Sequence, residues 1–303
     1  MMQYFGFFLQ EALFSVNVLT EYNWKVLYEL LSVTIIQCRK SSVSFGLSSV
    51  IWEKLLEDMM VQLMGKKANL EPQISRLLGQ VSFLDGMPRG FPALFKDTVR
   101  DGFWRIYQNS KVACEFILIS WSQSVNTCPG LAPKLLTPSF EREVFRILGE
   151  FQIVLTEGPP NDSAWLGREG SNEKNLMLFC FILVQFVNQC LAKMDREFRV
   201  GFVTRNLVEI TALSGLIPIA AGYEAFLEEW LVFYMAAVFT LNDTRTPDTE
   251  NVLLERLLEI KATEFVSRRF DSFGKPQAKE ISKAMKEAVG NYQLAKRYLK
   301  TAY

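Results

Sequence analysis

The stretch "SSVIWEKLLEDMMVQLMGKK" at residues 48–67 decides the fold class. The apolar residues that recur every four positions share one face of an α-helix: Ile51, Leu55, Met59 and Leu63. Serines that can cap a helix precede this run, and a glycine followed by two lysines ends it. The pattern predicts an amphipathic helix that buries one face.

The same period recurs in two later stretches. "SFEREVFRILGEFQIVL" at 139–155 and "TPDTENVLLERLLEIKATEFVSRRF" at 246–270 both start with residues that cap helices. The apolar face of the first stretch contains Phe140, Val144, Ile147 and Leu148, and that of the second contains Leu253, Leu254, Leu257, Leu258 and Ile260. We therefore expect an all-α protein.

Breaks rich in Pro, Gly, Asn and Asp separate the helical stretches, as loops require. The break "NTCPGLAPKLLTPS" at 126–139 is the best candidate for a lobe boundary, and the longest break covers residues 156–172. We expect a two-lobed protein with an N-terminal helical lobe at 1–130, a C-terminal helical lobe at 131–266 and a basic helical arm at 267–303.

Composition argues against most kinds of catalysis. The 303 residues include no histidine, which removes the commonest general base and metal ligand. The glycine-rich phosphate loops, the serine nucleophile elbow and the zinc motifs are missing, and the five cysteines have no metal-ligand spacing. We expect a protein that is not an enzyme and has no cofactor or metal, with its cysteines reduced and buried as small apolar residues. An enzyme with a carboxylate-only metal site is the open alternative.

One apolar stretch, "NLMLFCFILVQFVNQCLAK" at 175–193, approaches the length of a membrane span. Its second half contains Gln185, Asn188 and Gln189, which suit a central buried helix better. The N-terminus lacks the basic start and cleavage site of a signal peptide. We expect a soluble, cytoplasmic protein without stable membrane insertion.

Basic residues alternate with aromatic ones in two segments, a pattern typical of single-stranded nucleic-acid binding. In "PRGFPALFKDTVRDGFWRIYQNSK" at 88–111 the candidates are Arg100, Arg105 and Trp104. In "AKMDREFRVGFVTRN" at 192–206 Lys193, Arg196 and Arg199 are expected on one helical stripe, with Arg205 and Phe202 nearby. The alternative is a core helix in each case, with buried aromatics and charges paired to neighbouring acids.

The tail concentrates positive charge in a chain of zero net charge, because residues 261–303 contain ten Lys or Arg and four acids. The stretch "AKEISKAMKEAVGNYQLAKRYL" at 278–299 predicts an arm with an apolar face and a lysine face. Such an arm can dock on a neighbouring subunit and so form a homo-oligomer through Lys279, Ile281, Met285, Val289 and Tyr292. It could equally pack on its own domain or bind RNA.

The residues "FVSRRFDSFGKPQAKEISKAMKEAV" at 265–289 and "YLKTAY" at 298–303 resemble the end of nucleoproteins of segmented negative-strand, bunyavirus-like RNA viruses. The stretch "SGLIPIAAGYEAFLEEWLVFYMAAVF" at 214–239 is similar to the turn and helix that precede that end. The resemblance implies an all-helical, two-lobed viral nucleocapsid protein that holds single-stranded RNA between its lobes and polymerises through terminal arms. It also implies a viral polymerase as partner and the virion as a location.

We therefore expect an RNA-encapsidating nucleoprotein that forms ribonucleoprotein without sequence specificity. Arg268 and Arg269 join the basic and aromatic residues of the two internal segments as its RNA-binding candidates. The near-neutral sequence pI of about 6.5 departs from the basic character common among such proteins. The alternative is a helical protein–protein interaction scaffold or adaptor that binds no nucleic acid.

Overall fold

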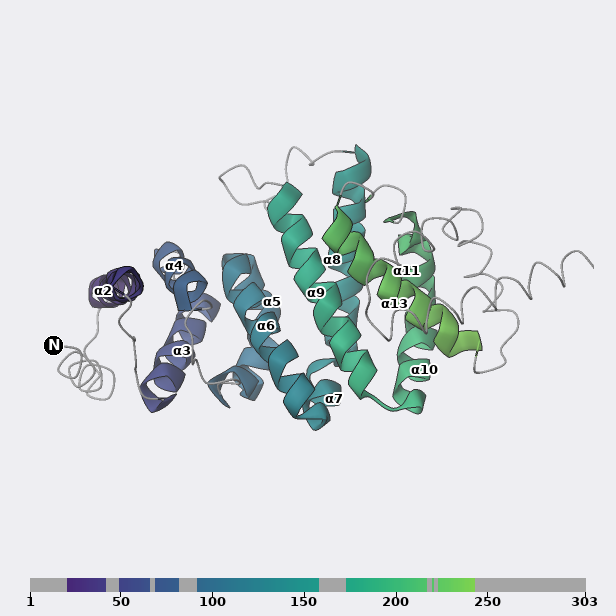
Figure 1. The fold of residues 1–303 in the computed structure, drawn as a ribbon, viewed down its shortest axis with the longest axis horizontal. Helices are drawn as coiled ribbons and strands as arrows, with labels where there is room; N and C mark the ends of the chain where they lie inside the picture. Colours follow the sequence, from purple (N-terminus) through teal and green to yellow (C-terminus); the bar gives the residue numbers. More distant parts are fainter. Residues whose placement is uncertain are drawn as a thin grey trace, which may run out of the picture. The chain divides into compact units, whose positions relative to one another are not determined.

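The computed structural model describes residues 21–41, 49–65, 69–81, 92–157, 173–216, 220 and 223–242. Within these ranges every regular element is a helix, so the all-α prediction is confirmed (Figure 1). The chain divides into two compact units, Met1–Cys128 and Pro129–Tyr303. The predicted lobe boundary at 130 lies close to this division, and the predicted arm at 267–303 lies outside the described residues.

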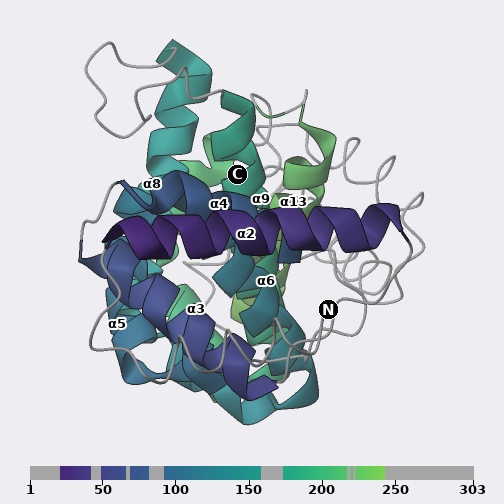
Figure 2. The ribbon, with the colours of Figure 1, turned by 90° about the vertical axis from the view of Figure 1, so that its left-hand side faces the viewer.

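The first unit contains five α-helices and a 3₁₀ turn within its described residues. These are α2 (Glu21–Lys40), α3 (Ser49–Met64), α4 (Glu71–Val81), η1 (Pro92–Phe95), α5 (Asp97–Asn109) and α6 (Lys111–Thr127). Helix α2 packs on α4, α3 packs on α5 and η1, and α6 packs on both α4 and α5. Figure 2 shows α2 lying across the outer side of this unit.

The predicted apolar face of α3 is buried, since Ile51, Leu55, Met59 and Leu63 are at most 5% exposed. Trp121 lies in the same unit, fully buried, with its indole N–H donating to the carbonyl of Leu94 at 2.9 Å. Its ring stacks on Phe103 with centroids 5.4 Å apart. These contacts hold α6, η1 and α5 together around one apolar core.

A single serine separates α5 from α6. Ser110 is in extended conformation, and its N–H closes α5 on the carbonyl of Ile106 at 2.7 Å. Its hydroxyl then caps α6 by accepting from the N–H of Ala113 at 3.2 Å, and it lies 2.8 Å from the hydroxyl of Ser75 on α4. A serine suits this position because a side-chain oxygen satisfies an unpaired N–H at a helix start.

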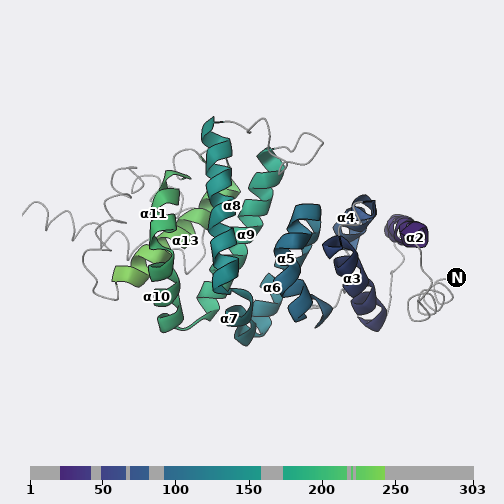
Figure 3. The same cartoon turned by 180° about the vertical axis from the view of Figure 1, so that it is seen from behind.

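The second unit combines three helices of 19 to 21 residues with several shorter ones within its described residues. Its elements are η2 (Pro129–Leu131), α7 (Ala132–Leu135), α8 (Pro138–Glu157), α9 (Glu173–Lys193), α10 (Arg196–Arg205), α11 (Leu207–Ala212), η3 (Leu213–Gly215) and α13 (Glu224–Asn242). Helix α9 packs against α7, α8 and α13, and α10 packs against α13. Figure 3 shows this unit from the side of α8.

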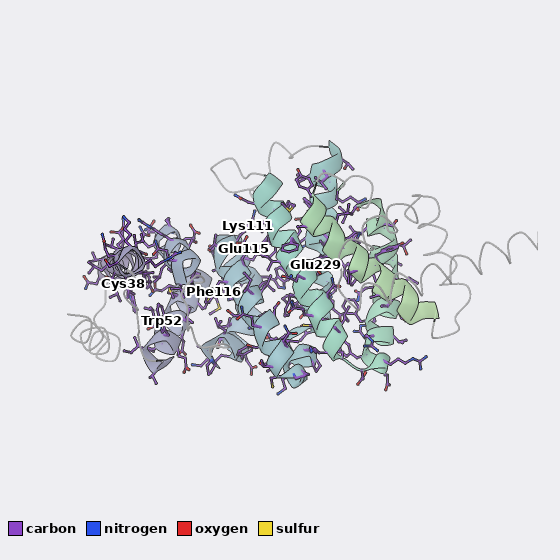
Figure 4. The ribbon with its side chains drawn as sticks, in the orientation of Figure 1. Cys38, Trp52, Lys111, Glu115, Phe116 and Glu229 are labelled. Atoms are coloured by element: carbon purple, nitrogen blue, oxygen red, sulfur yellow. The ribbon has the colours of Figure 1, made fainter. Side chains whose placement is uncertain are left out.

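The predicted apolar face of α8 is buried, with Phe140, Val144, Ile147 and Leu148 at most 3% exposed. An amide on α9 holds α13 in register. The side chain of Asn188 donates to the backbone carbonyl of Glu229 at 2.9 Å and to its Oε2 at 3.0 Å. The Glu229 side chain is buried between these helices (Figure 4).

Among the described residues one helical segment, Asn175–Lys193, is long and apolar enough to cross a membrane, with mean hydropathy 1.7. Just over half of it, 56%, is buried inside the protein, and core helices pass the same test of length and composition. Its packing against three other helices agrees with the central position predicted for residues 175–193.

All five cysteines are free thiols. Four of them are buried, as predicted, and burial raises the pKa of the Cys114 and Cys190 thiols. The prediction is wrong for Cys128, which is exposed because it ends α6 directly before Pro129, where the chain leaves the first unit.

Candidate nucleic-acid interface

In α5 the predicted basic residues are largely neutralised by acids. The Arg100 guanidinium lies 3.0 Å from Asp97 and 3.0 Å from Asp101, and its hydrogen bond to Asp101 raises its pKa. Lys96, just before the helix, pairs with Glu57 at 2.6 Å. The arrangement agrees with the alternative of a core helix whose charges are paired on its own surface.

The predicted stacking residue of α5, Trp104, is half-buried. Its ring meets Phe103 edge-on at 4.8 Å and Tyr107 edge-on at 5.8 Å. Arg105 beside it is exposed and makes no ion pair with another described residue. Of the two cations predicted in this segment, Arg100 is therefore paired with acids and Arg105 is exposed.

The second basic segment does not form one helical stripe, so that prediction is wrong. Helix α9 ends at Lys193 and α10 begins at Arg196. The side chain of Asp195 caps α10 by accepting from the N–H of Phe198 at 2.8 Å. Asp195 in this way satisfies a backbone N–H that has no partner within α10. The cap marks the start of a new helix, so the chain changes direction between α9 and α10.

The corner still gathers cations. We name residues 193–199 the α9–α10 corner; within it Lys193 and Arg196 are exposed. Arg199 is half-buried and its Nη1 donates to the carbonyl of Met194 at 3.2 Å. Three positive side chains therefore surround this turn. Of its two acids, Asp195 caps the backbone of α10 and Glu197 is exposed.

Two further exposed cations of the second unit carried no aromatic signal in the sequence. Lys134 is exposed on α7, and Figures 1 and 3 both place α7 beside the end of α9 and the start of α10. Arg142 is exposed in the first turns of α8. Neither side chain forms an ion pair with any described residue. The sequence pattern does not single them out because each cation stands apart from other basic and aromatic residues. Lys134 comes near the end of α9 only because α7 packs on α9.

Arg205, in contrast, is a structural residue. Its Nη2 donates to Oε1 of Glu141 at 2.9 Å, and its Nε lies 3.4 Å from Oε2. Glu141 is 2% exposed and also accepts from the side chain of Asn206 at 3.0 Å. The guanidinium lies over the ring of Phe198 at 5.9 Å. This network fixes the end of α10 to the start of α8.

Gly201 leaves the space that Arg205 occupies. A Cβ at this position would lie 3.2 Å from Nη1 of Arg205. An alanine here would therefore require the guanidinium to shift by a few tenths of an ångström.

Phe202 is not a stacking platform, so that prediction is wrong. Its ring is fully buried, with its centroid 6.1 Å from that of Phe145 and 6.2 Å from that of Phe233. A base cannot reach either face of a ring enclosed in the core. Phe202 instead anchors α10 to α8 and α13.

The tail candidates lie outside the described residues. These are Arg268 and Arg269 for RNA, and Lys279, Ile281, Met285, Val289 and Tyr292 for oligomerisation. The helix predicted at 246–270 and nearly all of the predicted loop at 156–172 lie outside them as well.

No group of three or more acidic, cysteine or histidine side chains in the described ranges could hold a metal ion. A small apolar cavity of about 10 Å³ lies between α8, α9 and α13, lined by residues such as Phe145, Val187 and Trp230. It has room for about one water molecule. The cavity is therefore too small for an organic ligand.

Comparison of the chain with protein-family models, with curated proteins and with solved structures gave no match.

Proposed function

We propose that the protein is an RNA-encapsidating nucleoprotein, and that the α9–α10 corner forms part of its phosphate-binding surface. The observation that carries the proposal is the exposure of Lys193 and Arg196 around a turn where one of the two local acids, Asp195, is engaged as a helix cap and the other, Glu197, is exposed. Lys134 adds an exposed cation on α7, which packs on α9. Such a surface attracts a phosphate backbone irrespective of base sequence.

The mechanism is that of a scaffold. Lysine and arginine side chains replace the counterions of the RNA backbone, and the released ions supply much of the binding free energy. Exposed Arg105, beside half-buried Trp104, offers a second contact in which a base can stack on the plane of the guanidinium. Homo-oligomerisation would extend this binding along the strand, and the polymerase that copies the RNA would be a partner in the cytoplasm and virion.

The test is fluorescence anisotropy of a short labelled single-stranded RNA with protein stripped of nucleic acid, titrated across salt. Binding should weaken linearly in log salt, with little dependence on RNA sequence. Each phosphate contact on a single strand contributes a slope of about 0.7. The double variant Lys193→Ala with Arg196→Ala should therefore reduce the slope by about 1.4.

The matched control removes two exposed cations of the first unit, Lys25→Ala with Arg76→Ala. This control changes net charge equally but leaves the corner intact, so its slope should stay within experimental error of the unmodified protein. Equal losses in both variants would show that only net charge matters and would remove the corner from the site. Flat anisotropy at low salt would reject RNA binding and favour the scaffold alternative.

A further inference from the structure

Two side chains cross the α9–α10 corner in opposite directions. Asp195 reaches forward along the chain, and its carboxylate accepts from the N–H of Phe198 at 2.8 Å. Arg199 reaches back, and its Nη1 donates to the carbonyl of Met194 at 3.2 Å. The backbone N–H of Arg199 also donates to the carbonyl of Asp195 at 3.2 Å. Three hydrogen bonds therefore close the turn, and we name the two made by side chains the corner brace.

Each contact of the corner brace satisfies a backbone group at a helix end. Helix α10 begins at Arg196, and the N–H groups of its first turn have no partner inside the helix. Asp195 supplies an acceptor for one of them. Helix α9 ends at Lys193, and Arg199 supplies a donor for the carbonyl of Met194, a residue that is 7% exposed. A buried carbonyl without a donor is unfavourable, so the Arg199 guanidinium has a structural role in the corner.

The two helices that meet at the corner are anchored elsewhere as well. Helix α9 packs against α7, α8 and α13, and α10 packs against α13. The end of α10 is held by Arg205 with Glu141, and its middle by the buried ring of Phe202. Figure 1 shows the chain changing direction between α9 and α10. Because both helices are anchored, a braced turn gives the residues on either side of it fixed backbone positions.

The two exposed cations of the corner flank this turn directly. Lys193 is the last residue of α9, Arg196 is the first residue of α10, and neither belongs to the corner brace. Their separation and relative direction follow from the path of the two residues between them, Met194 and Asp195. Groups that are held in place before a ligand arrives lose less conformational entropy when it binds. The brace therefore favours phosphate binding by these two cations.

We propose that Asp195 and Arg199 are positioning residues of the phosphate-binding surface, which hold Lys193 and Arg196 in the arrangement that binds RNA, and that Arg199 itself contacts no phosphate. This inference rests on the proposed function, which assigns the corner to RNA. It gives an acid a favourable role in binding a polyanion, the opposite of what charge alone predicts. It also removes one of the three cations of the corner from the expected phosphate contacts.

The test is the anisotropy titration across salt, applied to two variants of Asp195 that have equal charge. Asp195→Asn keeps a side-chain oxygen that can cap a helix, whereas Asp195→Ala has none. Charge alone predicts that both variants bind RNA equally, and more tightly than the unmodified protein. We expect Asp195→Ala to bind about two- to fivefold more weakly than Asp195→Asn at every salt concentration, because a lost cap lowers the population of the ordered turn by up to about fivefold.

The matched control uses the other acid of the corner. Glu197 is exposed, and its replacement by glutamine or by alanine removes one negative charge, as at Asp195. Neither replacement removes a contact of the corner brace, so Glu197→Gln and Glu197→Ala should bind RNA within about twofold of each other. A difference between these two as large as that between the Asp195 variants would show a general effect of alanine in this turn and would overturn the proposal.

The role of Arg199 is tested against Arg196 on the same helix. The salt slope reports how many phosphates are contacted, whereas a smaller population of the braced turn weakens binding equally at every salt concentration. Arg196→Gln should therefore lower the slope by about 0.7. Arg199→Gln should weaken binding about two- to fivefold with the slope unchanged within error. A slope lowered by about 0.7 in Arg199→Gln would show that Arg199 contacts a phosphate, and would reject its positioning role.

Amide hydrogen exchange measures the corner brace without RNA. The N–H of Phe198 donates to Asp195, so it should exchange about fivefold faster in Asp195→Ala and stay protected in Asp195→Asn. Equal exchange rates in the two variants would overturn the brace.

The outcomes separate this inference from the proposed function. RNA binding by the unmodified protein, with equal affinities for Asp195→Asn and Asp195→Ala, would overturn the positioning role and leave the proposed function standing. Flat anisotropy with the unmodified protein would reject the proposed function, and with it the role of the brace in phosphate binding, even where hydrogen exchange shows the brace to be formed.

Discussion

The ion pair between Arg205 and Glu141 gives the sharpest prediction for stability. Replacing Arg205 by alanine removes both contacts to Oε1 and Oε2 of a carboxylate that is 2% exposed. The amide of Asn206 is then its remaining hydrogen-bond donor among the described side chains. An unpaired buried charge is costly because the protein interior solvates it poorly.

The size of the loss follows from the burial of the two partners. Removing one member of a fully buried pair costs about 3–5 kcal/mol. The Arg205 side chain is 47% exposed, so water can enter the space that it vacates, and we reduce the expected cost to about 2 kcal/mol. A loss of this size corresponds to a fall in melting temperature of roughly 4–8 °C for a unit of this length.

The assay is urea denaturation followed by circular dichroism, with Arg142→Ala as the control. Arg142 is the next residue after Glu141 and is exposed, so its removal should change the free energy of unfolding by less than about 0.5 kcal/mol. The double variant Glu141→Leu with Arg205→Ala should recover part of the loss, since it leaves no buried charge. If Arg205→Ala costs no more than Arg142→Ala, the network does not hold α10 on α8.

Three further predictions concern other parts of the fold. Replacing a helical glycine by alanine raises the free energy of unfolding by about 1 kcal/mol where the methyl group has room. Gly149→Ala has open space around it and should show this gain in urea denaturation. Gly102→Ala would place its methyl group against the sulfur of Met64 and should therefore not show it. Burial raises the pKa of Glu115 on α6 to about 7 (Figure 4), above the usual carboxyl value in the unfolded chain, so the folded state holds the proton more tightly. Stability should therefore fall as pH rises from about 4.5 to about 7, and Glu115→Gln should flatten this part of the curve; an unchanged slope would contradict the assignment. A thiol reagent should modify Cys128 quickly in the native protein and the buried cysteines only on unfolding, and fast reaction of two or more thiols would contradict the burial.

Helical periodicity was sufficient to predict the fold class and the buried faces of α3 and α8. Such faces depend on spacing along the chain, which the sequence records directly. The corner at Met194 and Asp195 is not predicted by the three-residue spacing of the cations, which favours one continuous helix. Aspartate is also a preferred helix cap, so Asp195 itself is a signal for a helix start.

The candidate site was harder to predict because it depends on contacts between distant segments. Arg205 is a structural residue because of Glu141, 64 positions earlier in the chain. Phe202 is a core residue because Phe145 and Phe233 enclose it from two other helices. Residue type and local spacing alone do not distinguish a cation that binds phosphate from one that pairs with a buried acid.

The position of α9 has a consequence for synthesis of the chain. Its partners α7 and α8 precede it, but α13 is complete only about 50 residues after α9 ends. At ribosomal speeds of about 5–20 residues per second, that interval lasts roughly 2–10 s. During this interval the nascent chain contains α9, whose segment Asn175–Lys193 is long and apolar enough to cross a membrane, without the helix that covers it and pairs with Asn188. Stalled nascent chains that end at residue 223 should therefore be digested by protease faster than chains extended well beyond 242, and equal rates would indicate that another partner shields α9.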